Sequence, residues 1–173
     1  MKYSFLLLSF LLANSIKENS EKYIFSQFSQ DVNISMNTFK LNKINKILIQ
    51  KQVKQTFYRD ELYYWNISIN DTTIAYAFLD NVKGKSMPIT FMVILDMGGN
   101  VINVSIIKYR EAYGGQISNK KWLAQFINRN NKSDYVIGKN IDGITGATIS
   151  VNSLSKGIQK IALLFNKVKD NLD

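Results

Sequence analysis

Residues 87–108 read MPITFMVILDMGGNVINVSIIK, which is two strand-forming runs with a turn between them. The first run carries apolar side chains on both faces from Ile89 to Leu95, which is typical of a central strand covered on both sides. The turn at Gly98-Gly99-Asn100 suits a tight hairpin, because such turns need residues that adopt positive φ. Pro88 begins the first run, where its missing N–H does least harm to strand pairing. The stretch therefore predicts a β-hairpin at the centre of a sheet.

Two further strand-forming runs lie upstream of this hairpin. Both are rich in residue types that favour strands, such as tyrosine, isoleucine, threonine and phenylalanine. Turn-forming residues separate the runs, first Asn70-Asp71 and then the region around Lys83-Gly84-Lys85. The sequence therefore predicts successive antiparallel strands at Leu62–Ile69, Thr73–Phe78, Met87–Leu95 and Val101–Lys108.

Helical patterns follow the predicted strands. In the clearest of them, apolar residues recur at spacings of four, three, four and three and form one continuous face. These residues are Leu154, Ile158, Ile161, Phe165 and Val168. Before that helix, Ser118-Asn119 can cap a shorter one that runs to about Asn130, and an extended piece is expected at Tyr135–Ile137. Helices that follow and cover an antiparallel sheet indicate a single domain of the α+β class.

The N-terminal part of the chain divides into two predicted segments. Residues 1–15 read MKYSFLLLSFLLANS, in which Lys2 precedes a short apolar core and small residues follow it. This layout is typical of a secretory signal peptide, and an ordinary buried helix is the alternative. Residues 16–57 are predicted to be an N-terminal extension with a helix, and residues 58–173 to be the main domain.

The predicted helix of the extension, from Asn42 to Phe57, is amphipathic and basic. Its apolar residues recur near helical spacing, with lysines among them. Those apolar residues are Ile44, Ile47, Leu48 and Val53. Such a stripe commonly packs on a protein core, which is our expectation here. A basic amphipathic helix can also contact a membrane surface, and that alternative stays open.

Composition excludes several classes of function. The chain has no cysteine and no histidine. Iron–sulfur clusters, c-type haem attachment, typical zinc sites and Ser-His or Cys-His catalysis all need one of these residues. Any redox chemistry must therefore come from an organic cofactor. The formal net charge is +9, but the lysines are scattered and no basic motif interleaved with aromatics points to nucleic acid.

The motif that can carry chemistry reads DGITGATIS at residues 142–150, directly before the clearest helix. Unpaired N–H groups and the helix dipole favour a phosphate at such a position. Gly146 and Ala147 leave room for a bulky ligand close to the backbone. Hydroxyls of Thr145, Thr148 and Ser150 can bind a phosphate or be modified, and helix capping by the same side chains is the alternative.

The motif resembles the flavinylation motif of the FMN-binding domain family. That family includes the C subunit of the sodium-pumping NADH:quinone reductase and the G subunit of the Rnf electron-transport complex. The resemblance implies that a flavin transferase, using FAD and magnesium, esterifies FMN through its phosphate to Thr148. It also implies that Thr145, Gly146 and Ala147 form the surrounding loop, with Asp142 and Ser150 in the recognition pattern.

A second segment, YREAYGG at residues 109–115, resembles the Glu-Thr-x-Gly-type loop of the same family. Ala112 stands where the family usually has threonine. By resemblance, Glu111, Gly114 and Gly115 are candidates for shaping the flavin ring site. A strand-to-helix turn that needs glycine for positive φ is the alternative. The resemblance makes residues 58–173 the expected FMN-binding domain.

These features together predict an exported electron carrier with covalent FMN, located in the periplasm or cell envelope. Its expected partners are a flavin transferase and redox proteins that can be membrane-bound, and no nucleic acid. No residue suggests an acid or base, so we expect electron transfer rather than catalysis on a substrate of its own. The alternatives are an accessory flavin subunit of a membrane redox complex and an exported binding module without a cofactor.

Overall fold

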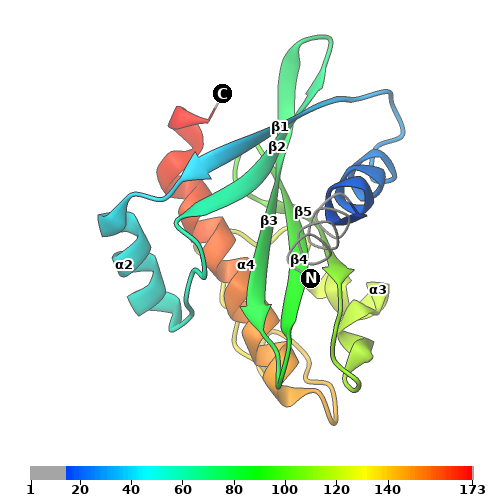
Figure 1. The fold of residues 1–173 in the computed structure, drawn as a ribbon, viewed down its shortest axis with the longest axis vertical. Coiled ribbons are helices and arrows are strands. Elements are labelled where there is room, and N and C mark those ends of the chain that lie inside the picture. The colour runs from blue at the N-terminus through cyan, green and yellow to red at the C-terminus, as the bar shows by residue number, and fades with distance from the viewer. Residues whose placement is uncertain (1–14, 173) are drawn as a thin grey trace, which may run out of the picture.

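The computed structural model describes residues 15–172 and contains one antiparallel sheet in the order β1-β2-β3-β4-β5 (Figure 1). Each strand pairs with its neighbour in sequence, so the sheet is a meander. The strands are β1 (Asn33–Lys40), β2 (Glu61–Ile69), β3 (Thr72–Lys83), β4 (Pro88–Asp96) and β5 (Val101–Lys108). The predicted signal peptide, apart from Ser15, lies outside the described residues.

The helical elements surround this sheet. A helix at residues 15–25 precedes β1, and no helix among the described residues is long and apolar enough to cross a bilayer. The other helices are α2 (Lys43–Val53), α3 (Lys120–Leu123) and α4 (Thr148–Val168), with 3-10 turns η1 (Gly115–Ser118), η2 (Ala124–Phe126) and η3 (Lys169–Asn171). The predicted α+β class with a helical N-terminal extension is confirmed. The extension also adds β1 to the sheet, a strand that its mostly polar sequence did not predict.

Strand β4 is covered on both faces, as its sequence predicted. Phe91 and Val93 belong to the apolar cluster shared with α4, whereas Met92 and Ile94 belong to a second cluster with Ile24 of the helix at residues 15–25. The predicted stripe of α4 is buried, with exposures of 0% to 3%. Helix α4 and the helix at residues 15–25 therefore lie on opposite faces of the sheet (Figure 1).

The helix predicted to run from Ser118-Asn119 to about Asn130 is shorter in the structure. Asn119 caps it as predicted, because its side chain accepts a hydrogen bond from the Lys121 N–H at 2.9 Å. The chain then leaves helical geometry at Ile127, which is extended, and Asn128 follows with a φ of 64°. The Asn128 N–H donates to the Val101 carbonyl at 2.8 Å, so the start of β5 holds the chain in this turn.

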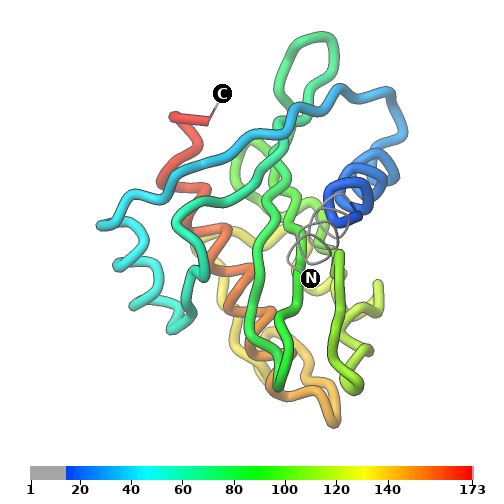
Figure 2. The backbone as a smooth tube through the Cα atoms, viewed as in Figure 1, coloured from blue at the N-terminus to red at the C-terminus, as the bar shows by residue number. Residues whose placement is uncertain are grey.

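Helix α2 forms where it was predicted, but its apolar face is reversed. Asn42 caps its start by accepting a hydrogen bond from the Ile44 N–H at 2.8 Å. Ile49 and Val53 are buried, whereas the remaining predicted stripe is exposed: Ile44 by 67%, Ile47 by 53% and Leu48 by 50%. The expectation that this stripe packs on the core is therefore wrong. Helix α2 lies beside α4 (Figure 2), and its buried residues Ile49 and Val53 lie on the side away from the exposed stripe.

Helix α4 approaches the sheet most closely at Gly157. A Cβ at this position would lie 2.6 Å from Val82 Cγ1 and 2.9 Å from Phe91 Cζ, and both of these side chains are fully buried. We expect Gly157→Ala to lower the free energy of unfolding by about 1–3 kcal/mol, because overpacking outweighs the helix propensity gained by alanine. Denaturant unfolding measures this change.

A second substitution to alanine in the same helix controls for the effect of alanine on helix stability. Ser155 is 1% exposed, and its hydroxyl has no hydrogen-bond partner among the described residues. Ser155→Ala should leave stability unchanged or raise it, since it removes an unsatisfied buried polar atom. A Gly157→Ala protein as stable as the wild type would show that the helix–sheet contact tolerates a methyl group.

Candidate functional site

The first turn of α4 carries no side-chain cap. Ala147 occupies the N-cap position, and no side chain hydrogen-bonds to the first N–H groups of the helix. Neither Thr145 nor Thr148 therefore caps the helix, contrary to the capping alternative. N–H groups without a side-chain cap and the dipole of a 21-residue helix favour a phosphate at this end.

The hydroxyl-bearing residues of the motif differ in exposure. Thr145 and Thr148 are exposed, whereas Ser150 is 5% exposed and faces the protein interior. Thr148 is the first residue of α4, and its carbonyl accepts a hydrogen bond from Asn152 Nδ2 at 2.9 Å. Thr148 thus presents an accessible hydroxyl directly beside the uncapped helix end.

A hollow of about 370 Å³ opens at this helix end. We call it the Thr148 hollow. Its lining residues are Ile137, Gly143, Ile144, Thr145, Thr148, Val151 and Asn152. Its volume lies in the range of small-molecule sites. Two of the predicted residues, Thr145 and Thr148, line it. Asn152 was missed, although it lies four residues after Thr148 and therefore on the same helix face.

The loop before the motif is held by the short helices after β5. Trp122 Nε1 donates to the Asp142 carbonyl at 2.8 Å, and the Asp142 N–H donates to Gln125 Oε1 at 2.8 Å. Both hydrogen bonds use the backbone of Asp142, and the residue itself is exposed. Further along, Gly146 has a φ of 79°, a conformation that L side chains rarely adopt. The loop geometry therefore depends on Trp122 and Gln125, which the motif itself does not reveal.

The two predicted site segments meet at Gly114 and Ala147. Gly114 has a φ of 81°, and a Cβ on it would lie 2.9 Å from Tyr109 Oη and 3.4 Å from Ala147 Cβ. Only glycine fits this position without strain. Gly114 therefore serves both the strand-to-helix turn and the contact with the 142–150 motif. Gly115 follows as the first residue of η1. Ala147, on the motif side of this contact, is 4% exposed.

Glu111 has a structural partner away from the Thr148 hollow. Its Oε1 accepts hydrogen bonds from the N–H groups of Ser86 at 2.7 Å and Met87 at 3.0 Å. These bonds hold the pKa of the Glu111 carboxyl below its usual value, because they favour the ionised form. The structure thus directs this carboxylate to the turn between β3 and β4.

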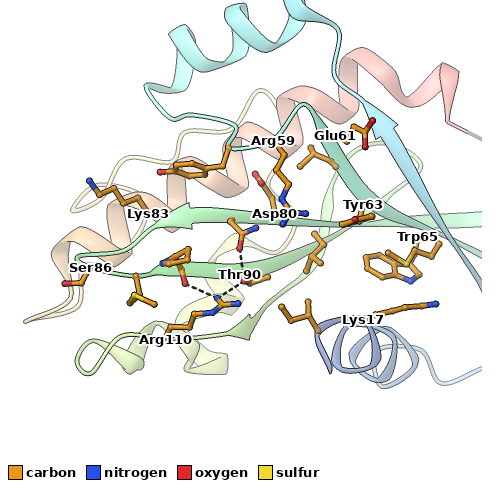
Figure 3. A pocket seen from close by; sticks show the side chains of 18 residues that line it. Lys17, Arg59, Glu61, Tyr63, Trp65, Asp80, Lys83, Ser86, Thr90 and Arg110 are labelled. Carbon is orange, nitrogen blue, oxygen red and sulfur yellow. Dashed lines mark hydrogen bonds between the residues drawn. The ribbon is translucent and has the colours of Figure 1, made fainter. Parts of the chain in front are cut away.

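A larger groove of about 930 Å³ lies on the face of the sheet away from α4 (Figure 3). Its labelled lining includes Tyr63, Trp65 and Arg110. The Arg110 guanidinium donates to the Pro88 carbonyl at 3.0 Å and to Thr90 Oγ1 at 2.9 Å, so its orientation is fixed. None of the predicted site residues lines this groove. It is therefore separate from the Thr148 hollow.

The Thr148 hollow has features that suit an anionic group. The described residues contain no cluster of acidic side chains that could hold a metal ion. The small hollow lies instead beside a helix N-terminus without a side-chain cap, and this combination favours an anionic group.

Comparison with protein families gives a match to the FMN-binding domain. The model of the FMN-binding domain matches residues 84–162, a span that begins in the turn before β4 and ends within α4. This span contains both the 109–115 segment and the whole 142–150 motif. A comparison with proteins of curated function finds no match to the chain.

Proposed function

We propose that this protein is an exported electron carrier with FMN esterified to Thr148, since the model of the FMN-binding domain matches residues 84–162. One observation carries the attachment site. Thr148 has an exposed hydroxyl and is the first residue of a 21-residue helix whose N-terminus has no side-chain cap. The motif thus combines the atom to be modified with the N–H groups that stabilise the attached phosphate.

The attachment reaction needs FAD and a flavin transferase, as the family resemblance implies. The Thr148 hydroxyl oxygen forms a bond to the phosphorus on the flavin side of the FAD pyrophosphate. The pyrophosphate bond breaks, AMP leaves with the bonding electron pair, and the hydroxyl proton passes to a base of the transferase. No electron is gained or lost by the protein in this step.

The protein's own residues then position and shield the attached group. The N–H groups of the first turn of α4 would hold the phosphate, and Gly114 lets the 109–115 loop approach Ala147. Bound flavin supplies one- and two-electron redox chemistry, and the protein tunes its potential through nearby charges and hydrogen bonds. Export makes a covalent bond advantageous, because lost FMN would not be regained outside the cytoplasm. We further propose redox proteins of the envelope as electron donor and acceptor.

The proposal is tested on protein recovered from the periplasm of a host that expresses a flavin transferase. The expected result is an intact mass higher by one esterified FMN, with a visible flavin spectrum that bleaches on reduction and returns on reoxidation. The same chain from a host without the transferase is the control and should lack both signals. An unmodified mass in the presence of active transferase would overturn covalent attachment. Retention of the protein in the cytoplasm would overturn export.

A further inference from the structure

The outward face of α2 carries a contiguous apolar stripe with no partner among the described residues. Ile44, Ile47 and Leu48 are 67%, 53% and 50% exposed and lie at helical spacings of three and four. Residues so spaced share one helix face. The buried residues Ile49 and Val53 point to the other side, where α2 packs beside α4. The stripe is therefore left in contact with solvent although the helix is firmly docked.

The surroundings of this stripe are mostly basic. Lys51 continues the stripe at the next helical position, and Lys43 and Lys54 are also exposed at the two ends of the helix. Lys46 is engaged by Asp60, with Nζ and Oδ1 2.7 Å apart. Residues 32–59 contain no acidic residue. They contain six basic ones, namely Lys40, Lys43, Lys46, Lys51, Lys54 and Arg59.

We propose that the outward face of α2 docks on the surface of a bilayer that contains anionic lipid. Aliphatic side chains ringed by lysines are the pattern of helices that lie in the membrane interface. The lysine ammonium groups can reach lipid phosphates while their stems lie along the apolar layer. A protein partner fits less well, because lysine is depleted from the centres of protein–protein interfaces.

Docking through α2 would place α4 behind α2, about one helix diameter from the bilayer. Gln55, just after α2, donates a hydrogen bond from Nε2 to the carbonyl of Ser153 in α4 at 3.1 Å. Ser153 follows Thr148 by five residues, a distance of about 8 Å along the helix axis. A membrane-bound electron donor or acceptor would then approach the flavin site from the side of α2. This consequence rests on the proposed function, whereas the docking itself does not.

The test uses the absence of cysteine from the chain, which makes single-cysteine labelling specific. Ile47→Cys is labelled with an environment-sensitive fluorophore, and Val136→Cys, at a residue that is 51% exposed outside α2, is the matched control. Vesicles of phosphatidylcholine with phosphatidylglycerol are added, and vesicles of phosphatidylcholine alone serve as the neutral comparison. We expect a blue shift at position 47 with anionic vesicles only, and none at position 136.

A second measurement separates apolar from electrostatic contributions. Ile44→Asn, Ile47→Asn and Leu48→Asn combined should weaken co-sedimentation with anionic vesicles by at least about tenfold, because their transfer into the interface is lost. High salt should weaken binding of the wild type as well.

Equal blue shifts at both labelled positions, or no shift at position 47, would overturn the proposal. So would a dimer in solution that the triple variant abolishes, since the stripe would then cover a second copy.

Because docking needs no flavin, the Thr148→Ala protein should bind vesicles as the wild type does. Failure of vesicle binding with intact FMN attachment would overturn the docking alone. Failure of attachment with intact vesicle binding would overturn the proposed function alone.

Discussion

Thr148→Ala is expected to carry no esterified FMN after production with a flavin transferase, whereas the wild type carries one. The reason is that the substitution removes the oxygen atom that forms the phosphoester. Thr148 is exposed, and its hydroxyl does not cap α4, so stability should change by less than about 0.5 kcal/mol. Intact mass and the flavin absorbance of the purified protein measure the outcome.

Two neighbouring substitutions control for this experiment. Thr145→Ala removes the other exposed hydroxyl of the Thr148 hollow and should keep the full mass gain. Thr148→Ser retains a hydroxyl at the same helix position and should keep some of the modification. FMN attached to the Thr148→Ala protein would place the ester elsewhere, and peptide mapping would then identify the residue.

Lys160→Met is expected to destabilise the protein by about 3–5 kcal/mol, because it leaves a buried carboxylate without its counter-charge. Lys160 Nζ lies 2.8 Å from Asp80 Oδ2, with side-chain exposures of 0% and 5%. The same ammonium donates to the Thr56 carbonyl at 2.8 Å and lies 4.3 Å from the centre of the Phe57 ring. The pair thus joins α4, β3 and the segment after α2 at one buried point.

Burial sets the energetics of this pair. It raises the pKa of Asp80 and lowers the pKa of Lys160, since both charged forms lose hydration. Replacing both partners with apolar residues, as in Lys160→Met with Asp80→Leu, should therefore recover much of the lost stability. Denaturant unfolding of the two single variants and the double variant measures the coupling between the two residues.

The exposed pair of Lys139 and Asp134, 3.3 Å apart, provides the control. Lys139→Met should cost less than about 1 kcal/mol, because exposed ion pairs contribute little. If Lys160→Met and Lys139→Met destabilise the protein equally, burial does not govern the first pair.

The sequence predicted the structure correctly where a hydrophobic pattern was long and compatible with only one buried face or one element type. The stripe of α4 follows from its helical periodicity, and the two covered faces of β4 follow from its unbroken apolar run. Both elements are buried as predicted. Helix α2 offered two apolar sides, one with Ile44 and one with Ile49, and only its packing beside α4 selects between them. The ion pair of Lys160 gave no local signal, because its partner Asp80 lies in a different element far along the chain.

In the candidate site, too, local features could be predicted from the sequence and long-range contacts could not. The motif made Thr148 a candidate for attachment, because the residue types and the helix that follows are all local in sequence. The hydrogen bonds of Trp122 and Gln125 to Asp142 depend on how a turn after β5 folds back, which no local pattern encodes. For Glu111, resemblance suggested the flavin ring site, and the structure shows its bonds to Ser86 and Met87.

The meander has a consequence for the order in which the chain acquires its structure. Every strand pairs with its neighbour in sequence, so the sheet forms by closing short loops, which is a fast process. Helix α4 instead contacts β3 and Thr56 across long stretches of chain. We therefore expect α4 to dock after the sheet has formed, and the contact between Ala147 and Gly114 to be among the last to form. A transferase that needs both segments would therefore modify only chains that have finished folding, and attached flavin would mark the correctly assembled molecule.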